Sequence, residues 1–166
     1  EKQAEIALAL SHFFYFEVMR QSSSDELHKL QQKYDPHLTL KDALVYAANR
    51  IEGNFPGNPL IEAEVRRHVG KGLLSMGENV KAIDHFEKSL QLQEQQQPVD
   101  EKMALRASTE LANAYIHLDQ QDKAIPLLKS TLARQEKLLG LDHSETLFSM
   151  HCLGVAYCNT SQYDKA

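Results

Sequence analysis

The sequence predicts an all-α protein in which antiparallel helix pairs repeat along the chain and stack into a solenoid. Two observations carry this prediction. Residues of similar size recur at a fixed offset of 42 positions, as Ala82, Ala124 and Ala166 do. Apolar residues also return every three or four positions within each period, which is the spacing of one face of a helix.

The same offset holds in six further columns of residues. They are Val69, Leu111 and Leu153; Gly70, Ala112 and Gly154; Gly72, Ala114 and Ala156; Leu73, Tyr115 and Tyr157; Phe86 and Leu128; and Leu90 and Leu132. Such agreement at one offset is hard to obtain by chance. We therefore expect a repeat array over residues 59–166, with units at about 59–100, 101–142 and 143–166, the last of them truncated.

Residues 1–58 lack this repeat and are expected to form a helical cap over the first unit. Residues 1–20 suggest one helix, and a second, short helix is expected from Asp25 to Tyr34, where the following Asp35–Pro36 step ends it. A third helix is expected from Leu40 to Ile51. Its apolar residues follow a regular helical stripe.

Capping residues mark the ends of these helices. Thr39 with Asp42 predicts a capping box for the third helix, and Gly53 its end. Asn58–Pro59 predicts an N-cap and a first helical residue for unit one. The other predicted N-terminal signals are Asp100, Asp122, Asp142 and the pair Ser161–Asp164. With Asp122 as N-cap, Pro126 would lie at the end of the first turn, where a proline is tolerated.

Small residues on the paired helices resemble the signature of the tetratricopeptide repeat. The matching positions are Gly70, Leu73, Ala82 and Phe86; Ala112, Tyr115, Ala124 and Leu128; and Gly154, Tyr157 and Ala166. The long unit, with Leu139–Gly140–Leu141–Asp142–His143 between repeats, is similar to the kinesin-light-chain type. The resemblance covers about residues 60–166. The run from Thr39 to Leu90 also resembles the start of repeat arrays in large bacterial signalling proteins.

The resemblance implies a right-handed α-solenoid whose inner face, lined by the first helix of each unit, binds a peptide or partner protein. It thus implies a scaffold or sensor module of a larger signalling or regulatory protein. By repeat position, twelve residues are expected in the groove: Arg67, Lys71, Leu74, Arg106, Thr109, Asn113, Ile116, His117, Phe148, His151, Val155 and Asn159. Glu64 and Cys158 fall on the same face.

The chemistry of these residues suggests the kind of ligand. The amide of Asn113 can both donate to and accept from a peptide backbone. Arg67, Lys71 and Arg106 would make the groove mouth cationic, so an acidic or carboxylate-terminated peptide is the expected partner. The alternative, that each residue is simply a solvated helix position, has similar weight for any one of them taken alone.

Catalytic and cofactor chemistry finds no support in the sequence. Phosphate-binding, dinucleotide and zincin motifs are absent, so no enzyme activity and no cofactor are expected. His117, His151 and Cys158 are the only plausible metal-ligand set, and ordinary surface polarity is the better interpretation. Cys152 and Cys158 lie six residues apart in one predicted helix, about 9 Å in rise, which is too far for a disulfide between them.

The composition argues against nucleic-acid binding and against a membrane span. The 18 Lys and Arg against 23 Asp and Glu give a net charge of −5, which argues against nucleic-acid binding by this chain. The most apolar stretch, Ile6 to Met19, is shorter than the roughly 20 residues that span a bilayer. The chain begins without Met and we interpret it as part of a longer protein, whose compartment the sequence does not indicate.

A second functional class is open: self-association without a peptide ligand. The aromatic run Phe13 to Phe16 covers more than one helix face, and it is expected either in the core or on a dimer surface. The truncated third unit would leave an apolar face that a second copy of the chain can cover. A homodimer through the N-terminal helix or this C-terminal face is therefore the alternative.

Overall fold

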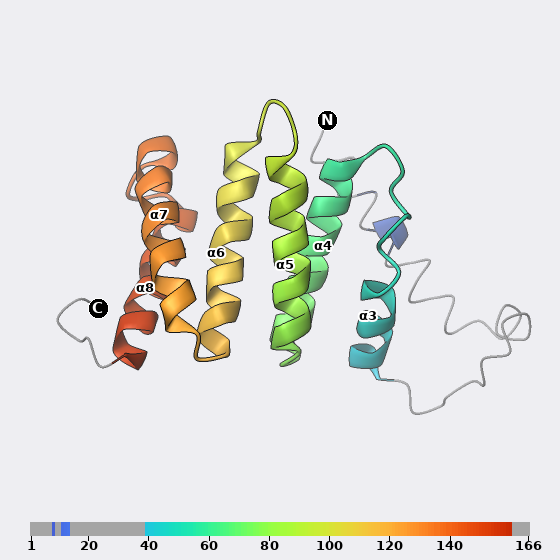
Figure 1. Ribbon diagram of the computed structural model, residues 1–166, viewed down its shortest axis with the longest axis horizontal. Coiled ribbons are helices and arrows are strands. Elements are labelled where there is room, and N and C mark those ends of the chain that lie inside the picture. The colour runs from blue at the N-terminus through green and yellow to red at the C-terminus, as the bar shows by residue number, and fades with distance from the viewer. Residues whose placement is uncertain (1–7, 9–10, 14–38, 161–166) are drawn as a thin grey trace, which may run out of the picture.

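The computed structural model describes residue 8, residues 11–13 and residues 39–160, and the labelled elements of this part are all helices (Figure 1). They are α3 (Leu40–Ala48), α4 (Pro59–Ser75), α5 (Asn79–Glu94), α6 (Glu101–His117), α7 (Gln121–Leu139) and α8 (Ser144–Asn159). The described part contains no strand. The prediction of an all-α repeat solenoid is confirmed.

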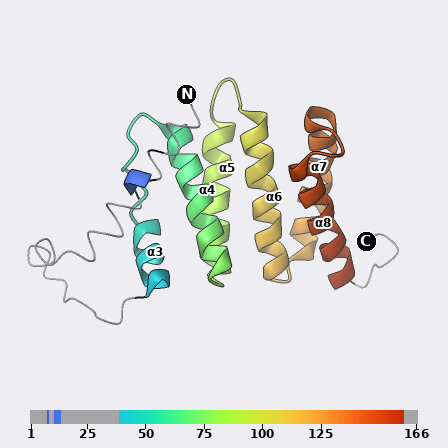
Figure 2. The same ribbon diagram turned by 180° about the vertical axis from the view of Figure 1, so that it is seen from behind.

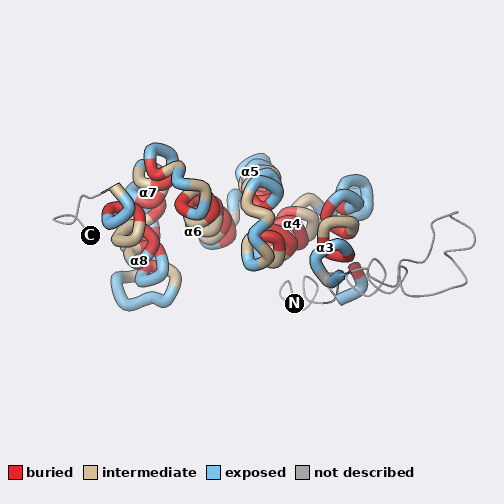
Figure 3. The backbone as a smooth tube through the Cα atoms, turned by 90° about the horizontal axis from the view of Figure 1, so that it is seen from below, coloured by how far each residue is buried: buried red, intermediate tan, exposed pale blue. Residues whose placement is uncertain are grey.

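Successive helices pack against one another in chain order, and the result is an elongated array of two layers. Seen from behind, α4, α6 and α8 lie on the near side, in front of α5 and α7 (Figure 2). An end-on view shows the same division between first and second helices (Figure 3). Direct contacts of α6 with both α4 and α8 join the first helices of successive units, so their side chains share one face, called here the inner face.

The register of the helices follows the predicted repeat. Helices α4 and α6 begin at Pro59 and Glu101, 42 positions apart, and α5 and α7 begin at Asn79 and Gln121, also 42 apart. The turn between the two helices of a pair has the left-handed conformation at equivalent positions, with φ +78° at Gly77 and +53° at Asp119. Asp tolerates this conformation better than most residues, so both turns can be built.

Three predicted helix starts are confirmed. The Thr39 side chain accepts from the Asp42 amide at 3.2 Å, and the Asp42 carboxylate accepts from the Thr39 amide at 3.0 Å, which completes the capping box of α3. Pro59 is the first residue of α4 after Asn58. Asp100 caps α6 by accepting from the Met103 amide at 3.3 Å.

Two predicted N-caps are wrong. Helix α7 begins earlier than predicted, because the Gln120 carbonyl takes the first backbone bonds from Lys123 and Ala124; Asp122 is therefore inside the first turn. Pro126 in consequence lies within α7 rather than at the end of its first turn. Helix α8 has His143 as its N-cap and not Asp142.

The His143 imidazole explains the second shift. Its Nδ1 accepts from the Glu145 amide at 3.2 Å and so satisfies a helix-end donor that the Asp142 side chain was expected to bind. The signal from Ser161 and Asp164 and the predicted helix from Asp25 to Tyr34 lie outside the described residues. The same holds for residues 1–20 apart from residue 8 and residues 11–13, all four of which are helical.

The third predicted helix ends earlier than expected. Helix α3 stops at Ala48 with Asn49 as C-cap, whereas the apolar stripe continues to Ile51. Ile51 is nonetheless completely buried, in the loop that leads to Gly53, where φ is +80°. The apolar pattern of the sequence therefore extends beyond the end of the helix, because Ile51 is buried in the loop.

Small residues allow close contacts in the core. A Cβ on Gly70 would lie 2.8 Å from Cε1 of Phe86, which is fully buried between α4 and α5. A Cβ on Gly72 would lie 2.7 Å from Cδ2 of Leu44, so this glycine lets the cap helix α3 approach α4. Phe13 joins the same core, with its ring centroid 5.8 Å from that of Phe55. For Phe13, core packing is thus the correct alternative; the other three aromatic residues of its run lie outside the described residues.

Candidate functional site

Two adjoining cavities open on the inner face, and we call them together the groove. The larger, of about 730 Å³, extends from α4 across α6 to α8, and the smaller, of about 350 Å³, lies between α6 and α8. Asn113 and His117 line both cavities and connect them.

All twelve residues predicted for the groove line one of these cavities. The larger cavity is lined by Arg67, Lys71, Leu74, Arg106, Thr109, Asn113, His117 and Phe148. The smaller cavity is lined in addition by Ile116, His151, Val155 and Asn159. Helical period explains this result, because residues at i, i+3, i+4 and i+7 of a first helix share one side of it. Of the two further inner-face residues, Glu64 is buried below the groove and Cys158 is exposed outside both cavities.

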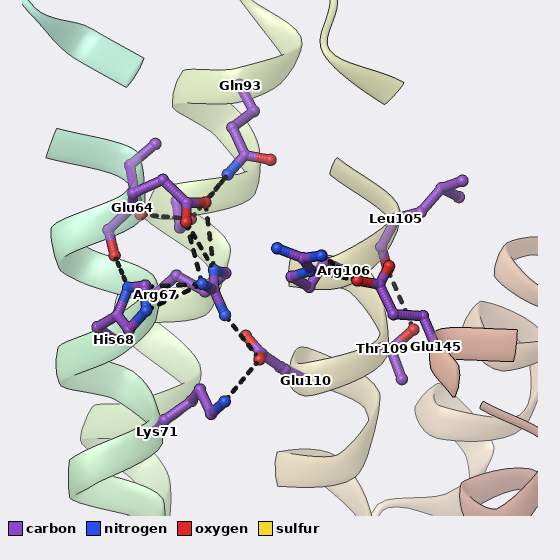
Figure 4. Close-up of polar contacts among 12 residues, drawn as sticks. Glu64, Arg67, His68, Lys71, Gln93, Leu105, Arg106, Thr109, Glu110 and Glu145 are labelled. Carbon is purple, nitrogen blue, oxygen red and sulfur yellow. Dashed lines mark hydrogen bonds and ion pairs between the residues drawn. The ribbon is translucent and has the colours of Figure 1, made fainter. Parts of the chain in front are cut away.

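Arg67 lies at the centre of an ion-pair cluster between α4 and α6 (Figure 4). Its Nη2 donates to Glu64 Oε2 at 3.0 Å, and its Nη1 donates to Glu110 Oε1 at 2.8 Å. Lys71 Nζ lies 3.5 Å from the same Glu110 oxygen. Gln93, from α5, donates to Glu64 Oε1 at 3.3 Å. The cluster therefore ties two first helices and one second helix together.

Burial and ion pairing act in opposite directions on the pKa values of Arg67 and Glu110. Burial would by itself lower the pKa of Arg67, but the bonds to Glu64 and the charge of Glu110 outweigh it and hold that pKa above its ordinary value. Burial raises the pKa of Glu110, although Arg67 and Lys71 oppose the rise. Burial also lowers the pKa of His68, whose Nδ1 lies 2.8 Å from the Glu64 carbonyl oxygen. In the neutral imidazole of His68, Nδ1 carries the hydrogen and donates it to the Glu64 carbonyl oxygen. Nε2 is then free of hydrogen and can accept from Arg67 Nη2.

A second set of polar contacts joins α6 to α8. Arg106 Nε donates to Glu145 Oε1 at 2.6 Å, and Arg106 Nη2 contacts the same oxygen (Figure 4). On the groove floor the hydroxyls of Thr109 and Ser149 lie 2.8 Å apart, and Gln135, from α7, donates to Thr109 at 3.2 Å. Each pair of neighbouring units is thus held across the inner face by an arginine and a glutamate.

Ion pairing changes the predicted electrostatics of the groove. The three cations expected to make its mouth positive, Arg67, Lys71 and Arg106, are each paired with a carboxylate. Arg67 is only 4% exposed, so its charge is directed into the structure. Lys71 and Arg106 keep more contact with solvent, with side chains 56% and 39% exposed. The mouth is therefore a set of ion pairs and not a surface of free positive charge.

Sequence reasoning missed several residues that shape this site. Glu110, Glu145 and the completely buried Gln135 line the larger cavity, and Gln93 is completely buried against Glu64. Gln93 and Gln135 are themselves 42 positions apart, so the repeat offset was a signal that could have identified them. Glu110 and Glu145 are not related by that offset, and their contacts become visible only in the fold.

The smaller cavity combines apolar and polar groups. The Cys152 thiol lies 3.9 Å from Asn113 Oδ1 and can donate to it. Burial raises the pKa of Cys152 to about 11, so the thiol stays protonated at neutral pH. Both Cys152 and Cys158 are free, as their predicted separation required.

No metal-binding group is found in the part of the chain that the structure describes. His117 and His151 both line the smaller cavity, but no three His, Cys, Asp or Glu side chains among the described residues lie close enough together to hold a metal ion. The helices of this part also include none with the length and apolarity of a membrane span.

Comparisons with known proteins give the class of the fold. Residues 103–166 match the family model of the tetratricopeptide repeat. The whole fold is similar to a solved structure described as a kinesin light chain from Podosopora anserina with nearly identical TPR-like repeats. The TM-score is 0.63 at 16% sequence identity, and the match covers 99% of this chain and 82% of that one. No curated protein sequence matches this chain.

Residues 103–166 therefore match the tetratricopeptide repeat, and the chain as a whole has a helix-pair fold similar to that of kinesin-light-chain-like repeats. The identification predicted from the small-residue pattern and the 42-residue unit is confirmed. Repeats of this class generally mediate interactions between proteins, and they typically act as scaffolds without catalysing a reaction.

Proposed function

We propose that this chain is a protein-interaction module that binds an extended segment of a partner protein in the groove. It would serve as the scaffold or sensor part of a larger signalling or regulatory protein. The observation that supports this most directly is that first helices of three successive units line two connected cavities on one face. A segment following the groove would contact all three units, and the larger cavity has the volume of an ordinary ligand site.

The groove has the mixture of groups that an extended peptide needs. Leu74 and Phe148 line the larger cavity, and Phe148 is 44% exposed, so apolar side chains of a ligand have a surface to cover. Asn113, at the junction of the cavities, has an amide that can pair with a peptide backbone. Leu74, Phe148 and Asn113 would recognise the shape and the backbone of a ligand more than its net charge. An acidic or carboxylate-terminated ligand stays a prediction from the sequence, and it would have only the exposed parts of the paired Lys71 and Arg106 side chains to contact.

The test is capture of peptides from a display library of random extended sequences. We expect the chain to enrich a defined motif and an Asn113→Ala, Phe148→Ala double variant to lose it. The matched control is Val80→Ala with Gln91→Ala, because both residues are exposed on α5, away from the groove. Arg67 is not used in this test, since removing a buried ion-pair partner would confuse folding with binding. Equal enrichment by both variants would contradict the proposal.

Self-association is the second candidate, and one observation favours it. Leu147 on α8 is 51% exposed, whereas its counterparts one and two units earlier, Leu105 and Ala63, are buried. An apolar residue at a position that other units cover is a suitable contact for a second copy of the chain. Phe13 is less suitable, because it is already buried in the core. Sedimentation that gives a monomer mass at every concentration would exclude this candidate, and a dimer that Leu147→Ser dissociates would support it.

A further inference from the structure

Glu110 is a largely buried carboxylate of the groove that has one oxygen without a partner among the described residues. Its side chain is only 12% exposed, and its Oε1 takes both of its ion pairs, from Arg67 at 2.8 Å and Lys71 at 3.5 Å. Its Oε2 is buried and has no hydrogen-bond partner within the described residues. Arg67 also serves Glu64, so Glu110 receives only part of one buried cation. A desolvated carboxylate with an unused oxygen gains strongly from any further donor.

Lys71 is the partner of Glu110 that can leave most easily. Its side chain is 56% exposed, and its ammonium lies 3.5 Å from Glu110 Oε1, farther than the 2.8 Å of Arg67. If the Lys71 ammonium turns outward it is rehydrated at once, and the side of Glu110 that it covered becomes accessible from the larger cavity, which both residues line.

The other unused polar group of the larger cavity is also an acceptor. Gln135 Oε1 is buried without a partner among the described residues, while its Nε2 is occupied by Thr109. The guanidinium groups of Arg67 and Arg106, in contrast, already donate to carboxylates. The two buried polar atoms of its lining residues that have no partner among the described residues, Glu110 Oε2 and Gln135 Oε1, are therefore both acceptors.

We propose that the groove binds its peptide through a lysine or arginine side chain of the ligand, whose cationic group replaces the Lys71 ammonium on Glu110. This inference rests on the proposed function and gives the chemical class of its ligand. It is opposite in charge to the ligand predicted from the sequence, because that prediction counted the cations of the groove without their partners. Leu74, which lines the same cavity, would contact the apolar stem of the incoming side chain.

The test uses three fluorescent peptide libraries that are identical except for a central Lys, Gln or Glu. Fluorescence anisotropy gives the affinity of each for the chain. We expect the Lys library to bind about tenfold more tightly than the Gln library, and the Glu library to bind most weakly. Glu110→Gln should reduce the affinity for the Lys library to that for the Gln library. The matched control, Glu101→Gln, is on the same helix in an exposed ion pair with Arg134, and it should change nothing.

Lys71→Met gives a second test by the sign of its effect. Because the substitution removes the internal competitor for Glu110, it should strengthen binding of the Lys library. In a groove that selects acidic ligands, the Glu library binds best and Lys71→Met weakens it; that result would overturn the proposal. Equal binding of all three libraries, unaffected by Glu110→Gln, would remove the role of Glu110 and leave peptide binding intact. If no library binds, the proposed function itself fails. Lys71 is exposed, so this variant is informative even if Glu110→Gln does not fold.

Discussion

Arg67 on α4 and Glu110 on α6 join the first helices of two successive units, with 2.8 Å between Nη1 and Oε1. The same guanidinium holds Glu64 within its own helix. By the repeat offset the counterpart of Arg67 in unit two is Thr109, a neutral residue, and units two and three are joined instead by Arg106 and Glu145. The junction between units is therefore built from different residues each time, although the helices repeat.

The first prediction concerns the stability that depends on Arg67. Replacing it by Leu leaves two buried carboxylates, those of Glu64 and Glu110, without their shared cation. We expect Arg67→Leu to lower the free energy of unfolding by about 3 kcal/mol, because an unpaired buried charge is far more costly than a lost surface pair. Urea unfolding followed by circular dichroism measures this change.

A matched control separates burial from ion pairing. Arg134 and Glu101 also form an ion pair, at 3.0 Å, but their side chains are 54% and 45% exposed. Arg134→Ala should lower the free energy of unfolding by less than about 1 kcal/mol. If Arg67→Leu lowers it no more than this control does, the cluster between α4 and α6 contributes no special stability.

The second prediction links Gly70 to Phe86. A Cβ at position 70 would lie 2.8 Å from the Phe86 ring, whereas unit two has Ala112 and Leu128 at the equivalent positions. The sequence has thus paired a smaller residue with a larger one in unit one. Gly70→Ala should lower the free energy of unfolding by about 1 kcal/mol, after the gain in helix propensity is allowed for.

A double-mutant cycle tests this link. Phe86→Leu alone should destabilise the chain because it leaves a cavity beside Gly70. In the Gly70→Ala, Phe86→Leu double variant, the added methyl group enters that space. The double variant should therefore lose about 1 kcal/mol less free energy of unfolding than the sum of the losses in the two single variants. Additive losses in urea unfolding would mean that the two positions do not share space.

The third prediction compares two turns of the same shape. Gly77 has φ +78° and Asp119, one unit later, has φ +53°. An L-residue with a side chain is strained in this region, so Gly77→Ala should lower the free energy of unfolding by about 1 kcal/mol. Asp119→Gly should raise it by about 0.5 kcal/mol, because relief of strain exceeds the added entropy of the unfolded chain. Thermal unfolding of both variants measures the two signs, and a loss in Asp119→Gly would contradict the argument.

Helical periodicity predicted where side chains lie better than where helices end. The twelve groove residues share one face because direction around a helix depends only on residue spacing. The prediction that the helix from Leu40 extends to Ile51 was wrong, because an apolar pattern indicates burial and a loop residue can be buried as well. The N-cap of α8 was missed because His143 took a role that Asp142 fills more often.

The charge of the groove could not be predicted for a different reason. Whether Arg67 faces a ligand or Glu110 depends on the distance between two helices and on the conformation of long side chains. Neither the distance between the helices nor the side-chain conformation can be inferred from the sequence of a single repeat. Gln93 and Gln135 show the opposite case, since these buried amides recur at the repeat offset and belong to the unit itself.

The last prediction concerns His85, which is 6% exposed on α5. Burial lowers its pKa to about 4; the charges of Arg66 and Lys88 act in the same direction, and Asp84 opposes them. In the unfolded chain the imidazole takes a proton near its ordinary pKa of about 6.5, so between that pH and pH 4 the unfolded state binds more protons than the folded state. This contribution to stability is therefore present above pH 6.5 and is lost as the pH falls.

Replacing the imidazole should remove this pH dependence. Between pH 7 and pH 5, the free energy of unfolding of His85→Gln should fall by about 2 kcal/mol less than that of the unaltered chain. The comparison cancels the other titrating groups, including Glu110, whose raised pKa acts in the opposite sense because its protonated form is favoured in the folded state. Urea unfolding at the two pH values and one ionic strength measures the difference. If both proteins lose the same stability, His85 is protonated in the folded chain as readily as in the unfolded one, and its burial has no effect on its titration.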